Sequence, residues 1–256
     1  DNNTKLSLVE KNLISPDFIV NNLLSGGILI NDEENICITT AQEDNLKIQV
    51  FNSGIDLENT LNLAIEIDKK LEEIFGYCIN KKYGYLTSCP SDLGTGLRAS
   101  VMLHLPALSI TKNVNPLLEA LSNFGINIRG IFGKSTPSMG NIYQISNKQT
   151  LGVTENEIIR NLEIIVQKII EQERKVRKIL ADNSVKLADN IYRAYGILSN
   201  CRKLSYKESV NLLSMVKLGV DLGILKEIND LKIQKLYLYT KNANMQKYYA
   251  EEFDDN

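Results

Sequence analysis

The sequence has no tryptophan, one histidine and four cysteines among 256 residues. A single histidine, His104, excludes any metal or catalytic site that takes two or more histidines from one chain. Cys37, Cys78, Cys89 and Cys201 form no Cys-Xaa-Xaa-Cys pair, so their spacing does not favour a structural zinc site. A chain of this length builds a core without disulfides, and we therefore expect reduced thiols and a cytoplasmic protein.

Long apolar runs are also missing. No segment approaches the roughly 20 apolar residues that cross a bilayer, and the N-terminal sequence has no signal-peptide pattern. The net charge is −2, from 29 basic and 31 acidic side chains, whereas non-specific binders of nucleic acid or membrane surfaces are normally basic. We expect neither as a direct partner. The first residue, Asp1, is not methionine, which indicates either a processed start or a piece of a longer protein.

The sequence does contain a clear change of pattern along its length. Over the first 55 residues, apolar and polar residues alternate in short segments joined by polar turns, which predicts antiparallel strands with one buried face. We expect Ile28, Ile30, Ile36 and Ile38 to point toward that same face.

Helices and strands then follow one another before the pattern becomes entirely helical. Thr154 and Glu157 form a capping box that starts a long helix, and Ser205 with Glu208 starts a later one. We expect one helix of the last region to end at Gly196. The predicted fold class is α+β: an antiparallel sheet flanked by helices over residues 1–180, followed by a small all-α module over residues 181–256. The other predicted elements are helices at 56–75, 97–109 and 231–239, and strands at 83–88, 127–132 and 141–146.

The segment from Tyr85 to Arg98 carries the first chemical signal. A predicted strand leads into a loop with Gly94 and Gly96, and the loop leads into a predicted helix. Glycines let a backbone approach a ligand closely, and a helix N-terminus favours an anion. With the charge of Arg98, this arrangement predicts a phosphate cradle, although it is not a Walker A loop. An ordinary strand-to-helix connection is the alternative.

Cys89 lies in the same loop. A thiol near a helix start and an arginine is expected to have a lowered pKa and to exist partly as thiolate. Covalent catalysis would need His104 as its base, but that residue stands between apolar neighbours and fits a packed core histidine better. We therefore favour a thiolate that faces a cationic substrate.

Two further groups of charges flank predicted strands. Gln42, Glu43 and Asp44 follow one strand, and their carboxylates can hold or deprotonate a cation. Arg129 and Lys134 lie on either side of a loop entry. For both groups, ordinary solvated surface charge is the alternative interpretation.

The residues of this region resemble a known family. The segment TSCPSDLGTGLRASVMLHLPAL, residues 87–108, is similar to the signature loop of the ATP:guanidino phosphotransferases, the creatine and arginine kinase family. The segment RGIFGKSTPSMGNIYQISNKQTLG, residues 129–152, and the helical C-terminal region look like one branch, the bacterial protein-arginine kinases of the Clp stress-response system. The resemblance implies a phosphotransferase core over residues 1–180 and a module for dimerisation or phosphoarginine binding over residues 181–256.

The resemblance also implies roles for particular residues. Glu43 would orient and deprotonate the target guanidinium, and Cys89 would contact it as a thiolate. Arg98 and Arg129 would hold the phosphates of ATP, with Mg²⁺ bridging the phosphates and contacting mostly nucleotide and water. The nucleotide site implied in this way consists of Lys47, Arg98, Ala99, Ser100, Val101, Met102, Arg129, Gly130, Ile131, Phe132, Gly133 and Lys134.

Several positions depart from the family pattern. Asn45 and Lys47 stand where the family has histidine and arginine, and Gln42 replaces the first acidic residue. Lys134 stands where the protein-arginine kinases have glutamate, which inverts the local field for an arginine substrate. The family's N-terminal phosphate-binding segment and its arginine-rich C-terminal motif are not in the sequence.

Three functions follow as alternatives. The first is a protein-arginine kinase that marks proteins for Clp proteolysis, with a stress-gene repressor, a Clp ATPase and an activator protein as partners and a homodimer as its assembly. The second is a weakened or inactive pseudo-kinase that binds nucleotide or phosphoarginine; Glu43 favours the first and Lys134 the second. The third, a cysteine-dependent amidotransferase or deiminase, ranks last because His104 is the only candidate base.

Overall fold

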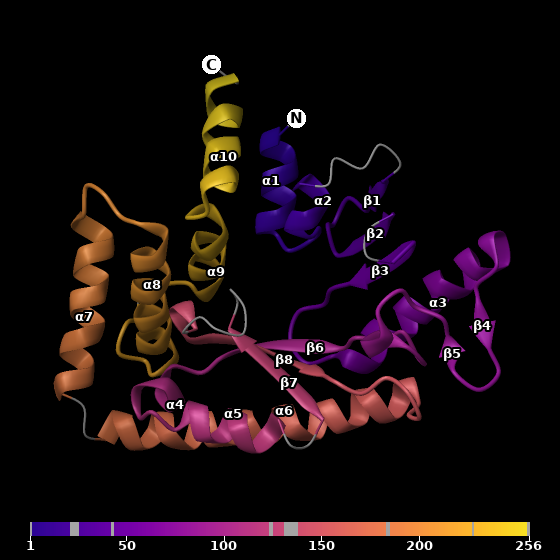
Figure 1. Ribbon diagram of the computed structural model, residues 1–256. Helices are drawn as coiled ribbons and strands as arrows, with labels where there is room; N and C mark the ends of the chain where they lie inside the picture. The colour runs from indigo at the N-terminus through magenta and orange to yellow at the C-terminus, as the bar shows by residue number, and fades with distance from the viewer. Residues whose placement is uncertain are drawn as a thin grey trace. The chain divides into compact units, whose positions relative to one another are not determined.

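The computed structural model describes residues 2–20, 26–41, 44–122, 125–130, 138–182, 185–226 and 228–254 (Figure 1). The chain divides into two compact units. Unit 1 contains residues 1–100 and 146–165, and unit 2 contains residues 101–145 and 166–256. Helices combine with small antiparallel sheets, so the predicted α+β class is confirmed. None of the helices that the structure describes combines the length and apolar character needed to span a bilayer.

Unit 1 begins with two helices, where sequence alternation alone predicted strands. Helix α1 covers Asn2–Glu10 and α2 covers Pro16–Val20. Two apolar residues of the segment between them, Leu13 and Ile14, are buried. The Leu13 carbonyl oxygen accepts a hydrogen bond of 3.3 Å from the buried Cys37 thiol. The prediction of sheet over the whole N-terminal region was therefore wrong for the first 20 residues.

The first sheet has the strand order β1-β2-β3, and both strand pairs are antiparallel. Ile28 pairs with Thr39 and Ile30 with Cys37, so these four side chains share one face. Cys37 and Thr39 are fully buried there. Ile36 and Ile38 lie on the opposite face, which corrects the prediction that all four isoleucines point the same way. The strands are Ile28–Ile30, Ile36–Thr40 and Leu46–Val50.

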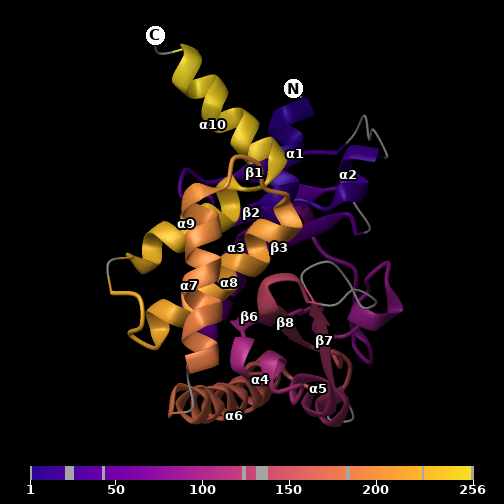
Figure 2. The same cartoon turned by 90° about the vertical axis from the view of Figure 1, so that its left-hand side faces the viewer.

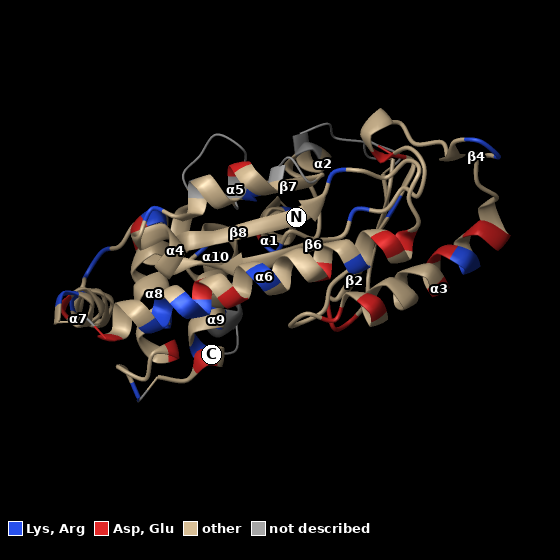
Figure 3. Cartoon of the chain, turned by 90° about the horizontal axis from the view of Figure 1, so that it is seen from below, with Lys and Arg blue, Asp and Glu red and all other residues tan. Residues whose placement is uncertain are grey.

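The remaining elements of unit 1 lead to the signature loop. Helix α3 covers Leu57–Phe75, as its helical spacing predicts, and packs against β3. A short hairpin of β4 and β5 and a single 3₁₀ turn, η1, then precede residue 93. Figure 3 shows both signs of charge interspersed along α3, a mixture typical of a solvated helix face. These last elements are Ile79–Asn80, Gly84–Tyr85 and Pro90–Asp92.

The helix predicted over residues 97–109 is wrong. The chain instead forms strand β6, Ser100–His104, and then the short helix α4, Pro106–Ile110. Val101 and Leu103 are buried, whereas Met102 between them is 52% exposed. This is the alternation of a strand, and Pro106 starts the helix because its missing N–H needs no partner at that position.

Strand β6 belongs to a second sheet with the order β6-β8-β7. The Leu105 N–H donates to the Asn141 carbonyl and the Asn147 N–H to the Ala99 carbonyl, which is an antiparallel pattern. The other elements here are α5 (Val114–Ser122), β7 (Ile126–Gly130), the 3₁₀ turn η2 (Met139–Asn141) and β8 (Ile142–Asn147). The two predicted strands at 127–132 and 141–146 are confirmed where the structure describes them.

The long helix α6, Glu155–Asp182, starts at the predicted capping box. The Glu157 carboxylate accepts from the Thr154 N–H at 2.8 Å, and the Thr154 hydroxyl accepts from the Glu157 N–H at 3.3 Å. One stripe of the helix is buried at spacings of three and four residues. This stripe contains Ile158, Leu162, Val166, Ile169 and Glu173.

Four helices complete unit 2. Helices α7 (Val185–Asn200) and α8 (Tyr206–Asp221) lie side by side (Figure 2), followed by α9 (Asp230–Tyr239) and α10 (Asn242–Asp254). Helix α7 runs past Gly196 to Asn200, so its predicted end was wrong. The shared apolar cluster of this region contains Leu187, Ile191, Ala194, Leu213, Val216, Leu218, Leu225 and Ile233.

Candidate functional site

The signature loop of unit 1, residues 86–99, is held by two buried polar side chains from a later segment. The Thr150 hydroxyl contacts the carbonyl oxygens of Ser91 at 3.0 Å and Leu93 at 2.8 Å. The Asn147 amide donates to the Leu97 carbonyl at 3.0 Å and accepts from the Ala99 N–H at 2.8 Å. Because buried polar groups are costly when unpaired, these bonds fix the middle of the loop and its C-terminal end.

Gly94 of the loop and Gly84 of β5 are required by close packing of the main chain. Gly94 has φ 110°, and a Cβ at this residue would lie 2.5 Å from the Thr150 carbonyl oxygen. A Cβ at Gly84 would clash with the Gly94 backbone in the same way. The predicted phosphate cradle also relied on a helix after the loop, and β6 stands there instead. Any anion site at this loop therefore depends on its side chains and loop N–H groups, not on a helix N-terminus.

A hydrogen bond connects the acidic turn between β2 and β3 to this loop. The Asp44 carboxylate accepts from the Ser88 N–H at 2.6 Å. Asp44 follows Glu43 in the chain, and Ser88 precedes Cys89. The residues adjacent to the two predicted catalytic side chains are thus in direct contact. Gln42 and Glu43 themselves lie outside the described residues.

Cys89 is half-buried at the start of η1. Its Sγ lies 3.0 Å from the Ser91 hydroxyl, and its carbonyl oxygen accepts from the Thr87 hydroxyl at 2.8 Å. The thiol thus stays accessible beside a hydroxyl that can donate to it.

Arg98 forms an ion pair with a residue of its own loop. Its Nη2 lies 2.5 Å from Asp92 Oδ1, and the two side chains are 48% and 20% exposed. Of the following residues, Ala99 and Val101 are buried, so only their backbone can face a ligand, whereas Met102 is exposed.

Lys47 lies on β3 opposite Thr39, and its side chain is exposed, as is that of Asn45. Burial raises the pKa of the Cys37 thiol, and the positive charge of Lys47 partly offsets that increase. The lysine therefore acts electrostatically on the face of the sheet that carries Cys37.

Unit 2 contains the other predicted phosphate ligand, Arg129, on β7. Its Nε is buried and has no hydrogen-bond partner among the described residues. A buried guanidinium N–H without a partner is costly unless a ligand or water satisfies it. Gly130 ends the strand, and Ile131, Phe132, Gly133 and Lys134 lie outside the described residues.

His104 is a hydrogen-bonded core residue, as its apolar neighbours predicted. Its Nε2 lies 2.8 Å from the Ser214 hydroxyl of α8, which also accepts from the Asn141 amide at 2.8 Å. Burial, and to a smaller extent the charge of Arg177, lower the pKa of His104 to about 3. The ring is therefore neutral at neutral pH.

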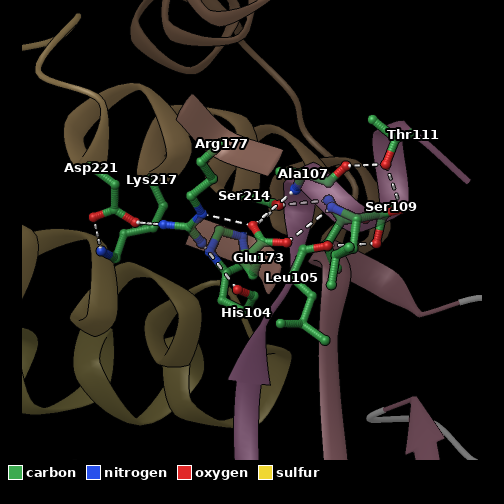
Figure 4. A network of polar contacts seen from close by, with 12 residues as sticks. His104, Leu105, Ala107, Ser109, Thr111, Glu173, Arg177, Ser214, Lys217 and Asp221 are labelled. Atoms are coloured by element: carbon green, nitrogen blue, oxygen red, sulfur yellow. Dashed lines mark hydrogen bonds and ion pairs between the residues drawn. The ribbon is translucent and has the colours of Figure 1, made fainter. Parts of the chain in front are cut away.

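A buried ionic network in unit 2 was not predicted from the sequence (Figure 4). Glu173 accepts the N–H groups of Ala107 at 3.0 Å and Leu108 at 2.9 Å, at the start of α4. Arg177 contacts Glu173 at 2.7 Å and Asp221 of α8 at 2.8 Å. The sequence signal was a glutamate on the apolar stripe of α6 with an arginine four residues later.

Among the residues that the structure describes, no group of three or more His, Cys, Asp or Glu side chains is placed to hold a metal ion.

Comparisons with known proteins cover nearly the whole chain. A family model described as ATP:guanido phosphotransferase, C-terminal catalytic domain, matches residues 1–176. A second, described as Protein-arginine kinase McsB C-terminal domain, matches residues 184–256. Curated proteins named protein-arginine kinase are similar: one from Halothermothrix orenii is 44% identical over 96% of this chain and 70% of its own length. One from Bacillus subtilis is 41% identical over 95% of this chain and 67% of its own length.

Solved structures agree. A duplicated taurocyamine kinase from Schistosoma mansoni, with bound components of a transition state analog, has a TM-score of 0.55 and 31% identity, over 60% of this chain and 21% of that one. A lombricine kinase has a TM-score of 0.53 and 29% identity, over 66% of this chain and 50% of that one. The chain therefore belongs to the ATP:guanido phosphotransferase family, in the branch of the bacterial protein-arginine kinases.

Proposed function

We propose that this chain transfers the γ-phosphoryl group of ATP to the guanidinium of arginine side chains in proteins. The observation that carries the proposal is the hydrogen bond between Asp44 and Ser88. It joins the turn that contains Glu43 to the loop that contains Cys89, which supports a general base and a thiol that serve one guanidinium. Family membership supports ATP and a protein substrate as the two reactants.

The chemistry requires positioning and charge rather than a covalent intermediate. Glu43 accepts a proton from the guanidinium, which exposes a nitrogen lone pair to the γ-phosphorus. Cys89, as a thiolate, stabilises the positive charge of the same group. The bond from phosphorus to the β,γ-bridging oxygen breaks as the bond from nitrogen to phosphorus forms, and ADP leaves.

The cationic side chains serve the nucleotide. Arg98 and Arg129 pair with phosphate oxygens. The Nε of Arg129, which has no hydrogen-bond partner among the described residues, can donate to such an oxygen. Lys47, the backbone of residues 98–102 and the segment 129–134 line the rest of the nucleotide site. Mg²⁺ would bridge the phosphates and neutralise part of their charge.

A pseudo-kinase is the second candidate. It is favoured by the substitutions at Gln42, Asn45, Lys47 and Lys134, and by the ion pair that neutralises Arg98. Such a protein would bind nucleotide or phosphoarginine and regulate a partner without transferring phosphate.

The wider setting is part of the proposal. We place the protein in the cytoplasm, as a homodimer, acting on a repressor of stress genes and a Clp ATPase under control of an activator protein. The catalytic core is residues 1–180, and residues 181–256 serve dimerisation or phosphoarginine binding.

The experiment is incubation of the chain with ATP, Mg²⁺ and an arginine-rich protein, followed by measurement of acid-labile phosphate. We expect activity that Glu43→Gln reduces at least ~100-fold, because general-base catalysis contributes about 10² to 10⁴. Glu58→Gln, at the start of α3, is the matched control and should keep full activity. Activity that appears only after Lys134→Glu would establish the pseudo-kinase instead.

A further inference from the structure

The ion pair between Asp92 and Arg98 places a carboxylate where the proposed site needs an anion from the nucleotide. The Asp92 oxygen lies 2.5 Å from Nη2 of Arg98. A phosphate oxygen binds a guanidinium through the same N–H groups and the same planar geometry. The two anions therefore compete for one cation.

The position of Asp92 is fixed by hydrogen bonds of its own backbone and of its neighbours. Its N–H donates to the Cys89 carbonyl at 3.0 Å, and its own carbonyl accepts from the Gly96 N–H at 3.1 Å. On either side of it, the Ser91 and Leu93 carbonyls are held by the buried hydroxyl of Thr150. The Asp92 backbone is thus fixed in both directions, and its side chain is mostly covered.

Arg98 has the longer and more exposed side chain of the pair. Its side chain is long and 48% exposed, so it can turn from the carboxylate to a phosphate. The Asp92 carboxylate stays behind when it does, close to the incoming negative charge.

We infer that Asp92 is an affinity-determining residue of the nucleotide site: it holds Arg98 in the empty protein and repels the phosphates that replace it. The inference rests on the proposed role of Arg98 in binding ATP. Asp92 makes ATP binding weaker than the cationic side chains alone would allow. The loss of affinity that it causes depends on the negative charge of the ligand.

Replacement of Asp92 by asparagine keeps the size and the backbone bonds and removes the charge. We expect Asp92→Asn to bind ATP with Mg²⁺ about two- to five-fold more tightly, the range for a partly exposed ion pair. Adenosine, which has no phosphate, should bind equally to both proteins. The gain for ATP should shrink as salt is raised from 50 to about 500 mM, because exposed charges are screened.

The measurement is isothermal titration calorimetry, with Asp189→Asn as the matched control. Asp189 also pairs with an exposed arginine, Arg193 on α7, at 2.7 Å, and its loss should leave ATP affinity unchanged. A double-mutant cycle with Arg98→Ala tests the coupling. In the Arg98→Ala protein, Asp92→Asn should increase ATP affinity only by the amount that comes from repulsion between the Asp92 carboxylate and the phosphates.

The outcomes separate the two proposals. If ATP binds the wild type and Asp92→Asn binds no more tightly, the role of Asp92 is overturned while the proposed function stands. If Asp92→Asn binds more weakly, Asp92 positions Arg98 for phosphate, and the inference is again wrong. If no variant binds ATP, both proposals fail together. Should Asp92→Asn fold poorly by circular dichroism, Asp92→Ser provides the same test.

Discussion

At the scale of single residues, His104 shows how burial connects protonation to folding. Its pKa is lowered from 6.5 to about 3 in the folded protein, by burial first and by Arg177 second; Asp221 opposes the shift and Lys217 adds to it. Between these two pKa values the unfolded chain binds more protons than the folded one. Stability therefore rises with pH across this window and is lost as the pH falls below about 6.5.

We predict that His104→Gln flattens this dependence. Between pH 7 and pH 5 the wild type should lose about 2 kcal/mol of unfolding free energy more than the variant does, as the two pKa values require. Urea denaturation at the two pH values measures the difference. Equal losses in both proteins would show that the ring is protonated as easily in the fold as outside it.

At the scale of elements, the network around Glu173 joins three helices of unit 2. The carboxylate caps α4, and Arg177 of α6 extends the network to Asp221 on α8. The side chains of Glu173 and Arg177 are only 4% and 16% exposed. A buried charge that loses its partner costs far more than an exposed one.

We predict that Arg177→Met lowers the free energy of unfolding by about 3 kcal/mol. The matched control is Arg193→Met, because Arg193 also pairs with an acid four residues earlier, but with side chains that are 73% and 57% exposed. That change should stay within about 0.5 kcal/mol. Denaturant unfolding measures both, and similar effects for the two variants would contradict a structural role of the network.

Sequence patterns predicted correctly those elements that are marked by residues close together in the sequence. The capping boxes at Thr154 and Ser205 marked helix starts correctly because both partners lie within four residues. The strand Ser100–His104 was missed although the buried Val101 and Leu103 flank the exposed Met102, since a glycine loop before it suggested a helix. The bonds of Thr150 to the signature loop join residues almost 60 apart, and no spacing rule predicts them.

At the scale of the whole molecule, the family models and the compact units divide the chain differently. The models meet between residues 176 and 184, whereas unit 2 joins residues 101–145 with 166–256. Ser214 and Asn211 of α8 hold His104 and Gly140, both of which precede that boundary. The C-terminal helices thus complete the packing of a segment that belongs to the catalytic family model.

We predict that a chain ending at Asp182 melts at a clearly lower temperature than the complete chain, because Arg177 loses its ion pair with Asp221 and His104 loses its hydrogen bond to Ser214. A fragment of residues 185–256 should keep helical circular dichroism, since its apolar cluster is internal. Thermal melts of both fragments and the complete chain provide the comparison. Equal melting temperatures for the first fragment and the complete chain would support a division at residue 180 instead.

The stacking of Gly84, Gly94 and Thr150 has a consequence for how this protein can vary in length. Their main chains touch directly, with no side chain between them to absorb a shift. An insertion of one residue in any of the three segments would shift the main chain of that segment relative to the other two. It would thereby displace Cys89 and Arg98 together. We therefore expect related chains to differ in length at the turn of residues 31–35, and not in these three segments.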